Sequence, residues 1–331
     1  GPVVSKIKLL PHNERDLLQE VISLGLVGPT PSLEEPRAKL LACIQRSMKI
    51  QRSFNHVSIL LVGKTGDGKS ATINHLLGVD YAKTNETQSE TKSIEEFVVH
   101  GSDLKYEVEG LSLGLVDTPG FWDTDGPDQI AYNLLSMQKF LKTHPSLSNC
   151  YPNLVFLLVK ASDKRLLGKD SELQKSLRCV KLLNIVDHNN PNVVTILSHA
   201  GDIQKKTNEE WTKELDKIKS TVSKFVSSIL NVSVPVVAIE NNYDDCDLEH
   251  CGDYTRLRSG ELQPKNLYDA CAEVLGDDSL GLITLNSIFR EAKKDCDRTI
   301  TTGHKYEAKK QYKFGSEEKK TVELFENAAK E

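Results

Sequence analysis

The sequence predicts an α/β fold, with a doubly wound, mostly parallel sheet and helical N- and C-terminal flanks. Three observations lead to this prediction. Short apolar runs alternate with helical patterns between residues 57 and 239, a glycine-rich loop joins the first of these runs to the first helix, and the flanks carry helical patterns. Ligands of such sheets bind at the carboxyl ends of the strands, so we expect functional motifs at those ends.

The predicted elements follow one another in a regular order. Residues 1–54 carry helical patterns around 13–26 and 37–52, separated by prolines, and are predicted to form a helical N-terminal extension. Strands are predicted at 57–62, 97–99, 111–116, 154–159, 193–197 and 234–239, and helices at 70–77, 128–142, 169–183 and 209–230. The central domain is therefore expected to cover residues 55–245. A helical C-terminal extension is expected over 246–331, with helices at 267–275 and 282–298 and a long charged helix from about 305.

Composition excludes several classes of protein. The chain has 331 residues, 38% of them hydrophobic, a formal charge of -5 and a pI near 6.0, which argues against a protein that coats nucleic acid. No apolar stretch approaches the roughly 20 residues that span a bilayer, so we expect no transmembrane segment; membrane association through missing termini or partners stays open. The cysteines number 7 and are scattered, as expected for reduced thiols in the cytoplasm. Cys246, His250 and Cys251 lack a second ligand pair, which disfavours a zinc site.

The run from Gly63 to Ser70, Gly-Lys-Thr-Gly-Asp-Gly-Lys-Ser, is a complete phosphate-binding loop. Its glycines let backbone N–H groups point inward, and the helix that follows presents its positive end to the same anion. Lys69 is expected to reach the β- and γ-phosphates, and Ser70 to hold a magnesium ion that bridges them. The residues predicted to bind nucleotide here are Gly63, Thr65, Gly66, Asp67, Gly68, Lys69, Ser70 and Ala71. The carboxylate of Asp67 is unusual in such a loop, and the sequence does not explain it.

A second motif, Asp117-Thr118-Pro119-Gly120, directly follows the strand that ends at Val116. Asp117 is expected to hold magnesium through water, and the Gly120 amide to meet the γ-phosphate. Residues 121–126 would then form a switch that senses the triphosphate, and the polar segment 81–94 is the other switch candidate. The two motifs together predict a P-loop GTPase domain.

With Thr91-Lys92-Ser93 and the Phe-Trp-Asp-Thr that follows Gly120, these motifs resemble a known family. Over about residues 55–242 the chain resembles the immunity-associated GTPases of the GIMAP type and the chloroplast outer-envelope Toc receptors, which are septin-related P-loop GTPases. The resemblance implies that Thr91 joins the magnesium shell and the catalytic set. Thr84 and Thr87 in the same segment are alternatives for that position.

Guanine recognition must come from later motifs, because the usual Asn/Thr-Lys-x-Asp clamp is absent. The run Ser198-His199-Ala200-Gly201-Asp202 is similar to the Toc variant, as is Glu240-Asn241-Asn242 after the next strand. His199 is expected to stack on the base, and Asn241 to lie against the nucleotide. Glu240 is expected to accept hydrogen bonds from guanine N1 and N2, donors that adenine lacks at that edge, which favours GTP and GDP as ligands. Asp202 is an alternative for this role if the loop is shifted.

The sequence also indicates how hydrolysis is limited. Phe121 and Trp122 stand where small GTPases often have a water-orienting glutamine, so slow intrinsic turnover is expected. The resemblance implies that Arg165 contacts a partner's phosphates in a nucleotide-dependent homodimer, although an exposed loop arginine is the alternative. We therefore expect a cytoplasmic guanine-nucleotide switch, with the cytosolic face of an organelle membrane as a second location. A scaffold that holds a structural nucleotide and an adenine-specific P-loop enzyme are the other hypotheses.

Overall fold

The structure is a computed structural model. The chain divides into two units, Gly1–Asn55 and His56–Glu331. The structure describes parts of the second unit, namely residues 56–77, 82, 93–100, 112–120, 127–147, 151–163, 166, 171–242, 248–252, 254–275 and 300–307. The predicted N-terminal helices therefore lie outside the described residues, as do the predicted helix at 282–298 and both switch segments apart from residues 82, 93 and 94.

A seven-stranded sheet organises the second unit, with the strand order β10-β2-β3-β1-β4-β5-β6. The strands are β1 His56–Val62, β2 Ser93–His100, β3 Ser112–Asp117, β4 Leu154–Lys160, β5 Val193–Ser198, β6 Val236–Ala238 and β10 Ile300–Glu307. From β3 to β6 all neighbouring strands are parallel, whereas β2 is antiparallel to both β3 and β10. The sequence prediction of a mostly parallel α/β sheet is confirmed.

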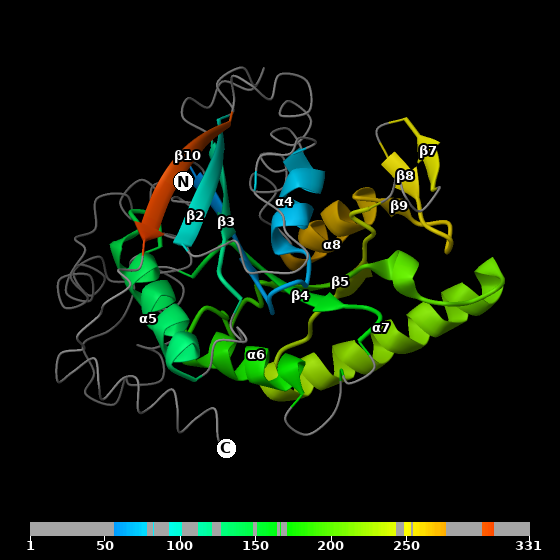
Figure 1. Ribbon diagram of the computed structural model, residues 1–331, viewed down its shortest axis with the longest axis horizontal. Coiled ribbons are helices and arrows are strands. Elements are labelled where there is room, and N and C mark those ends of the chain that lie inside the picture. The colour runs from blue at the N-terminus through cyan, green and yellow to red at the C-terminus, as the bar shows by residue number, and fades with distance from the viewer. Residues whose placement is uncertain are drawn as a thin grey trace, which may run out of the picture. The chain divides into compact units, whose positions relative to one another are not determined.

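Helices cover both faces of this sheet (Figure 1). The described helices are α4 Lys69–Leu77, α5 Pro127–Thr143, α6 Glu172–Leu182, α7 Asn208–Leu230 and α8 Lys265–Leu275. Buried side chains of α5, α6 and α7 pack on one face, and those of α4 and α8 on the other. Side chains of β1 contribute alternately to the two hydrophobic cores, because successive side chains of a strand point to opposite faces. Among the described residues, no helix has the length and apolar content needed to cross a bilayer.

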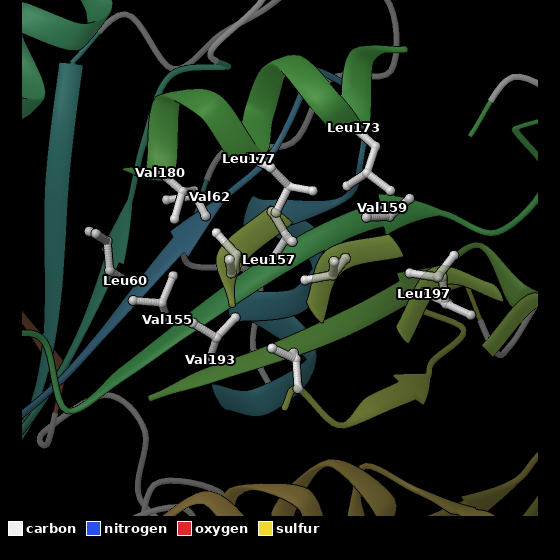
Figure 2. Close-up of a cluster of buried hydrophobic side chains, with 14 of the residues drawn as sticks. Leu60, Val62, Val155, Leu157, Val159, Leu173, Leu177, Val180, Val193 and Leu197 are labelled. Carbon is white, nitrogen blue, oxygen red and sulfur yellow. The ribbon is translucent and has the colours of Figure 1, made fainter. Parts of the chain in front are cut away.

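Figure 2 shows how α6 is held against the sheet. Leu173, Leu177 and Val180 lie on one side of the helix at spacings of four and three residues, and they point toward strand side chains such as Leu157 and Val159. Burying each such side chain is worth about 1.5–3 kcal/mol relative to exposure. This layer makes the strands a rigid base for the loops that leave their carboxyl ends.

The chain after residue 246 differs from the sequence expectation of a helical extension. Helix α8 is present as predicted, but it follows a three-stranded antiparallel sheet of β7 Glu249–Cys251, β8 Tyr254–Arg256 and β9 Leu262–Gln263. Two glycines in left-handed conformations turn the chain there, Gly252 at φ +65° and Gly260 at φ +90°. Their positions between short segments, the middle one beginning Tyr254-Thr255, are a hairpin signal that the helical interpretation overlooked.

Strand β10 is a second correction to that expectation. Residues 305–307 were assigned to a charged terminal helix, yet they continue a strand that pairs with β2 from Ile300↔Val99 to Glu307↔Ser93. The free edge of β2 explains the difference, because an unpaired strand edge offers a row of backbone donors and acceptors to any extended segment that can reach it. The last strand of the sheet therefore comes from the C-terminal part of the chain. The rest of the predicted terminal helix lies outside the described residues.

Candidate nucleotide site

The phosphate loop connects the carboxyl end of β1 to the start of α4. Gly66 and Gly68 both have φ +84°, a left-handed conformation that other residues adopt only at a cost. Gly63 is required for another reason, since a Cβ there would lie 2.8 Å from the carbonyl oxygen of Leu158 on β4. The sequence therefore places each glycine where the loop turns sharply or passes close to a neighbouring strand.

Lys69 lies over this loop with its side chain almost completely buried. Its Nζ donates to the carbonyl oxygens of Gly63, at 3.2 Å, and Lys64, at 2.9 Å. These two contacts hold the ammonium group beside the loop and near the start of α4, where the helix dipole also favours an anion. The ammonium group of Lys69 therefore lies beside the loop that is predicted to bind phosphate.

Asp67, which the sequence left unexplained, ties the loop to itself. Its Oδ2 accepts a hydrogen bond of 3.0 Å from the Lys64 amide, and its own amide donates to the Lys64 carbonyl at 3.2 Å. A short polar side chain that bonds the backbone three residues away is a recurrent way to fix a turn. The structure thus gives the carboxylate a role in loop shape.

Ser70 and Asp117 meet beside the loop, as the magnesium hypothesis requires. Ser70 Oγ donates to Asp117 Oδ2 at 2.7 Å. The other carboxylate oxygen, Asp117 Oδ1, is buried and has no hydrogen-bond partner among the described residues. Burial raises the pKa of Asp117, and the charge of Lys69 and the Ser70 hydroxyl oppose that rise. A hydroxyl and a carboxylate oxygen that lacks a donor suit Mg²⁺, which prefers hard oxygen ligands and keeps several waters.

The second motif packs directly on the phosphate loop. A Cβ at Gly120 would overlap Thr65 Oγ1, so only glycine allows this approach. Thr118 Oγ1 donates to the Leu61 carbonyl at 2.7 Å, which fixes the motif to β1, and Asn133 of α5 donates to the Gly120 carbonyl at 2.9 Å. The hydroxyl of Thr65 is itself buried without a partner among the residues that the structure covers. The two phosphate motifs therefore form one surface.

The loops after β5 and β6 reach the same end of the sheet. His199 has a left-handed backbone, φ 53°, and its ring bonds Ser198 Oγ at 2.9 Å. A Cβ at Gly68 would lie 3.4 Å from His199 Cε1 and 3.2 Å from Asn241 Nδ2. His199, which is predicted to stack on the base, and Asn241, which is predicted to lie against the nucleotide, therefore both adjoin the phosphate loop.

Asn241 is engaged with helix α4. Its Nδ2 donates to Thr72 Oγ1 at 3.0 Å, and its Oδ1 bonds His75 Nδ1 at 3.1 Å. The amide thus ties the loop after β6 to the helix that follows the phosphate loop. Thr72 and His75 were not singled out from the sequence, because their contacts join residues more than 160 positions apart.

Glu240 is buried where the loops after β5 and β6 meet, whereas Asp202 is exposed. Glu240 Oε2 accepts from the Gly201 amide at 2.6 Å, and Oε1 accepts from the Asn242 amide at 2.8 Å. Asp202 is exposed, accepts a hydrogen bond from Ser162 and pairs with Lys160 at 3.3 Å. Of the two candidate carboxylates for guanine recognition, Glu240 is thus buried and Asp202 exposed.

Several predicted site residues cannot be placed. Thr91, its alternatives Thr84 and Thr87, and Arg165 lie outside the described residues. Ala71 is described and lies partly exposed in the first turn of α4.

A second polar cluster, His56–Glu96–His144, lies away from the phosphate loop and was not predicted. His56 Nε2 bonds Glu96 Oε1 at 2.7 Å, and His144 Nε2 bonds Glu96 Oε2 at 2.9 Å. Burial alone would raise the pKa of Glu96, but the hydrogen bonds from His144 and His56 outweigh it and hold that pKa well below its ordinary value. The predicted strand at 97–99 was too short to include Glu96, which the structure buries within β2, so no clear signal for this cluster was present in the sequence.

The ligand atoms of this cluster lie within 4.8 Å of one another, a spacing that would suit a metal ion. The amide of Ser146, however, donates to His144 Nδ1 at 3.1 Å. The ring proton is therefore on Nε2, which faces Glu96, so that nitrogen has no lone pair for a metal. Hydrogen bonding, and not ligation, accounts for the cluster.

Comparisons with known proteins show the family to which the chain belongs. The AIG1 family matches residues 57–224, half of the chain. Translocase of chloroplast 90 from Arabidopsis thaliana is 28% identical over 263 residues, 76% of this chain and 31% of that protein. GTP-binding protein A from Dictyostelium discoideum is 33% identical over 87 residues, 26% of this chain and 18% of that protein. The chain thus spans less than a third of the length of these two relatives.

Among solved structures, Toc33 from Arabidopsis thaliana in complex with Mg²⁺ and GMPPNP is similar at 18% identity and a TM-score of 0.47, over 69% of this chain and 91% of that one. The family assignment does not depend on this structure. It rests on the match over residues 57–224, which contains the phosphate loop, Asp117 to Gly120 and His199. On that match, the chain belongs to the AIG1 family, the GIMAP- and Toc-type P-loop GTPases.

Proposed function

We propose that this chain is a guanine-nucleotide switch that binds GTP and GDP with magnesium, hydrolyses GTP slowly and self-associates in its triphosphate form. The observation that carries the proposal is the pair Ser70–Asp117 beside Lys69, with Asp117 Oδ1 buried and lacking a donor among the described residues. Magnesium, when bound, would neutralise charge on the β- and γ-phosphates. Lys69 would hold the same phosphates, and Thr91 is proposed to complete the magnesium shell.

Guanine selectivity is proposed to come from Glu240. Both of its oxygens already accept one backbone hydrogen bond, and a carboxylate oxygen can accept a second. Guanine N1 and N2 would supply these additional donors, whereas adenine has no donors at that edge and would supply neither. His199, next to Gly68, is proposed to stack on the base.

Slow turnover and self-association are proposed from the sequence. Phe121 and Trp122 replace a water-orienting glutamine, so an additional group must complete the site. We propose that Arg165 of a second copy supplies that group or senses the triphosphate. By similarity to a chloroplast translocase, we further propose that the chain works at the cytosolic face of an organelle membrane, which fractionation of cells that express it would test.

The central experiment measures mass by light scattering with GDP, with a non-hydrolysable GTP analogue and with the matching ATP analogue. A dimer with the GTP analogue alone, together with turnover per chain that rises with protein concentration, is expected. Arg165→Ala should abolish both effects, and Lys164→Ala is the matched control because it removes the neighbouring positive charge. A constant monomer with negligible turnover would instead favour a scaffold that holds a structural nucleotide.

A further inference from the structure

Gln263, the last residue of β9, is fully buried, and its side chain forms hydrogen bonds to the backbone of Glu240. Its Oε1 accepts from the Glu240 amide at 2.7 Å, and its Nε2 donates to the Glu240 carbonyl at 3.0 Å. The side-chain amide therefore does for Glu240 what a neighbouring strand does for a residue of a sheet. Two bonds to one residue fix both its position and its orientation.

Glu240 needs this support because the main sheet ends before it. Strand β6 has only three residues, and its pairing with β5 ends at Leu197↔Ala238. The next amide, that of Ile239, still donates to Leu197 at 2.9 Å. Within the described residues, the amide and carbonyl of Glu240 meet Gln263 instead of a strand.

The small sheet in turn holds Gln263. Its Nε2 also donates to Thr255 Oγ1 at 2.9 Å, and Thr255 lies opposite Gln263 in the pairing of β8 with β9. Both amide hydrogens and the amide oxygen of Gln263 are therefore used, and a reversed amide would face a donor with a donor. The position of Gln263 in the small sheet therefore determines where the backbone of Glu240 lies in the loop after β6.

We propose that Gln263 is a positioning residue for guanine selectivity: it sets the place of the Glu240 carboxylate without touching the nucleotide. The inference rests on the proposed function, in which Glu240 reads the guanine edge. A displaced carboxylate would lose its match to N1 and N2, whereas the phosphate contacts of the loop at residues 63–70 would remain. Loss of Gln263 should therefore weaken binding selectively for guanine.

The test compares the affinities of GDP, IDP and ADP by calorimetry. Gln263→Met keeps the side-chain length but removes all three hydrogen bonds, and it should lower the GDP-over-ADP preference on the order of tenfold, with the ADP affinity changed less than about twofold. IDP lacks the N2 amino group, so the GDP-over-IDP preference should fall as well. Gln138→Met is the matched control, because Gln138 lies on α5, which contacts β2 and β10 at the other side of the sheet.

Thr255→Val serves as the milder variant, since it removes only one bond of Gln263 and should lower selectivity about two- to threefold. Thermal unfolding would establish that each variant is folded, and Thr255→Val decides the question if Gln263→Met does not fold. Selectivity that Glu240→Ala destroys but Gln263→Met and Thr255→Val leave intact would overturn this inference alone. Equal binding of GDP and ADP by the unaltered chain would overturn the guanine assignment and the inference with it. Selectivity that survives Glu240→Ala would show that another group reads guanine, and it would overturn the role of Glu240 and the inference while leaving guanine as the ligand.

Discussion

Two groups of buried polar side chains lie at different places on the same sheet, and they differ in how well they are satisfied. In the His56–Glu96–His144 cluster, each carboxylate oxygen of Glu96 meets an imidazole nitrogen, and each imidazole has a second partner, Ser112 Oγ or the Ser146 amide. Beside the phosphate loop, Asp117 Oδ1 and Thr65 Oγ1 are buried without a partner among the described residues. An unsatisfied buried polar group costs about 1–3 kcal/mol. A ligand that bonds Asp117 Oδ1 and Thr65 Oγ1 would remove this cost and so bind more tightly, whereas the His56–Glu96–His144 cluster offers no such gain.

Position makes this contrast informative. Single unsatisfied atoms also occur elsewhere in the described part of the chain, for example at Ser58 on β1 and Thr195 on β5. Those of Thr65 and Asp117 adjoin one loop, with Lys69 and Ser70 beside them. We therefore expect the residues at the carboxyl end of β1 to bind a ligand, and the His56–Glu96–His144 cluster, at the other end of β1, to stabilise the fold.

Lys69→Ala should produce the largest effect. It removes a buried ammonium that is proposed to hold the phosphates, and loss of such a charged contact typically costs 2–5 kcal/mol, so GDP affinity should fall roughly 30- to 5,000-fold. Titration with a fluorescent guanine nucleotide measures this. Lys142→Ala, at an exposed position of α5, is the control and should bind normally. Normal binding by a folded Lys69→Ala variant would refute the assignment of the loop.

Glu96→Gln should give the second effect, on stability alone. An amide NH₂ would face one of the two imidazole N–H groups, and unfolding at neutral pH should become easier by about 2–3 kcal/mol, with nucleotide affinity unchanged. Glu273→Gln, an exposed change on α8, is the control. Weaker nucleotide binding by the Glu96 variant would show that the two groups are coupled after all.

The same variant should also change the pH dependence of unfolding. Because the pKa of Glu96 is lowered in the folded chain, its stabilisation is complete above the ordinary value of 4.5 and is lost as pH falls below that value. The stability difference between the two chains should therefore shrink as denaturant unfolding is measured at pH values from 6 down to 3. A constant difference would mean that Glu96 is not ionised against His56 and His144.

Ser70→Ala should have a smaller effect, confined to the metal. Without the hydroxyl, the gain in affinity for a GTP analogue on adding magnesium should drop about tenfold, whereas affinity in EDTA should hardly change. Ser220→Ala, exposed on α7, is the control. An unchanged magnesium dependence would remove Ser70 from the proposed ligand set.

Sequence reasoning succeeded where the chemistry is local and failed where it depends on distant pairing. The loop from Gly63 to Ser70 and the Asp117 motif each lie within a few residues, next to strands with clear apolar patterns, so both their positions and their contact were predictable. Strand β10 was missed because it is stabilised by the edge of β2, some 200 positions earlier. Gln263 was missed for the same reason, since its partner Glu240 is 23 residues away and lies in the loop after a strand of the other sheet.

Asp202→Asn should have the smallest effect, and it tests whether Asp202 takes part in guanine recognition. The Lys160–Asp202 pair joins side chains that are 41% and 48% exposed, and exposed pairs contribute at most about 1 kcal/mol. The GDP-over-ADP preference should stay within about twofold of the unaltered chain, because Glu240, not Asp202, is buried where the loops after β5 and β6 meet. Lys160→Gln removes the same pair from the other side and should match it. If Asp202→Asn alone lowered the preference, the carboxylate of Asp202 would have to contact the base, and Glu240 would hold only the backbone of the loops.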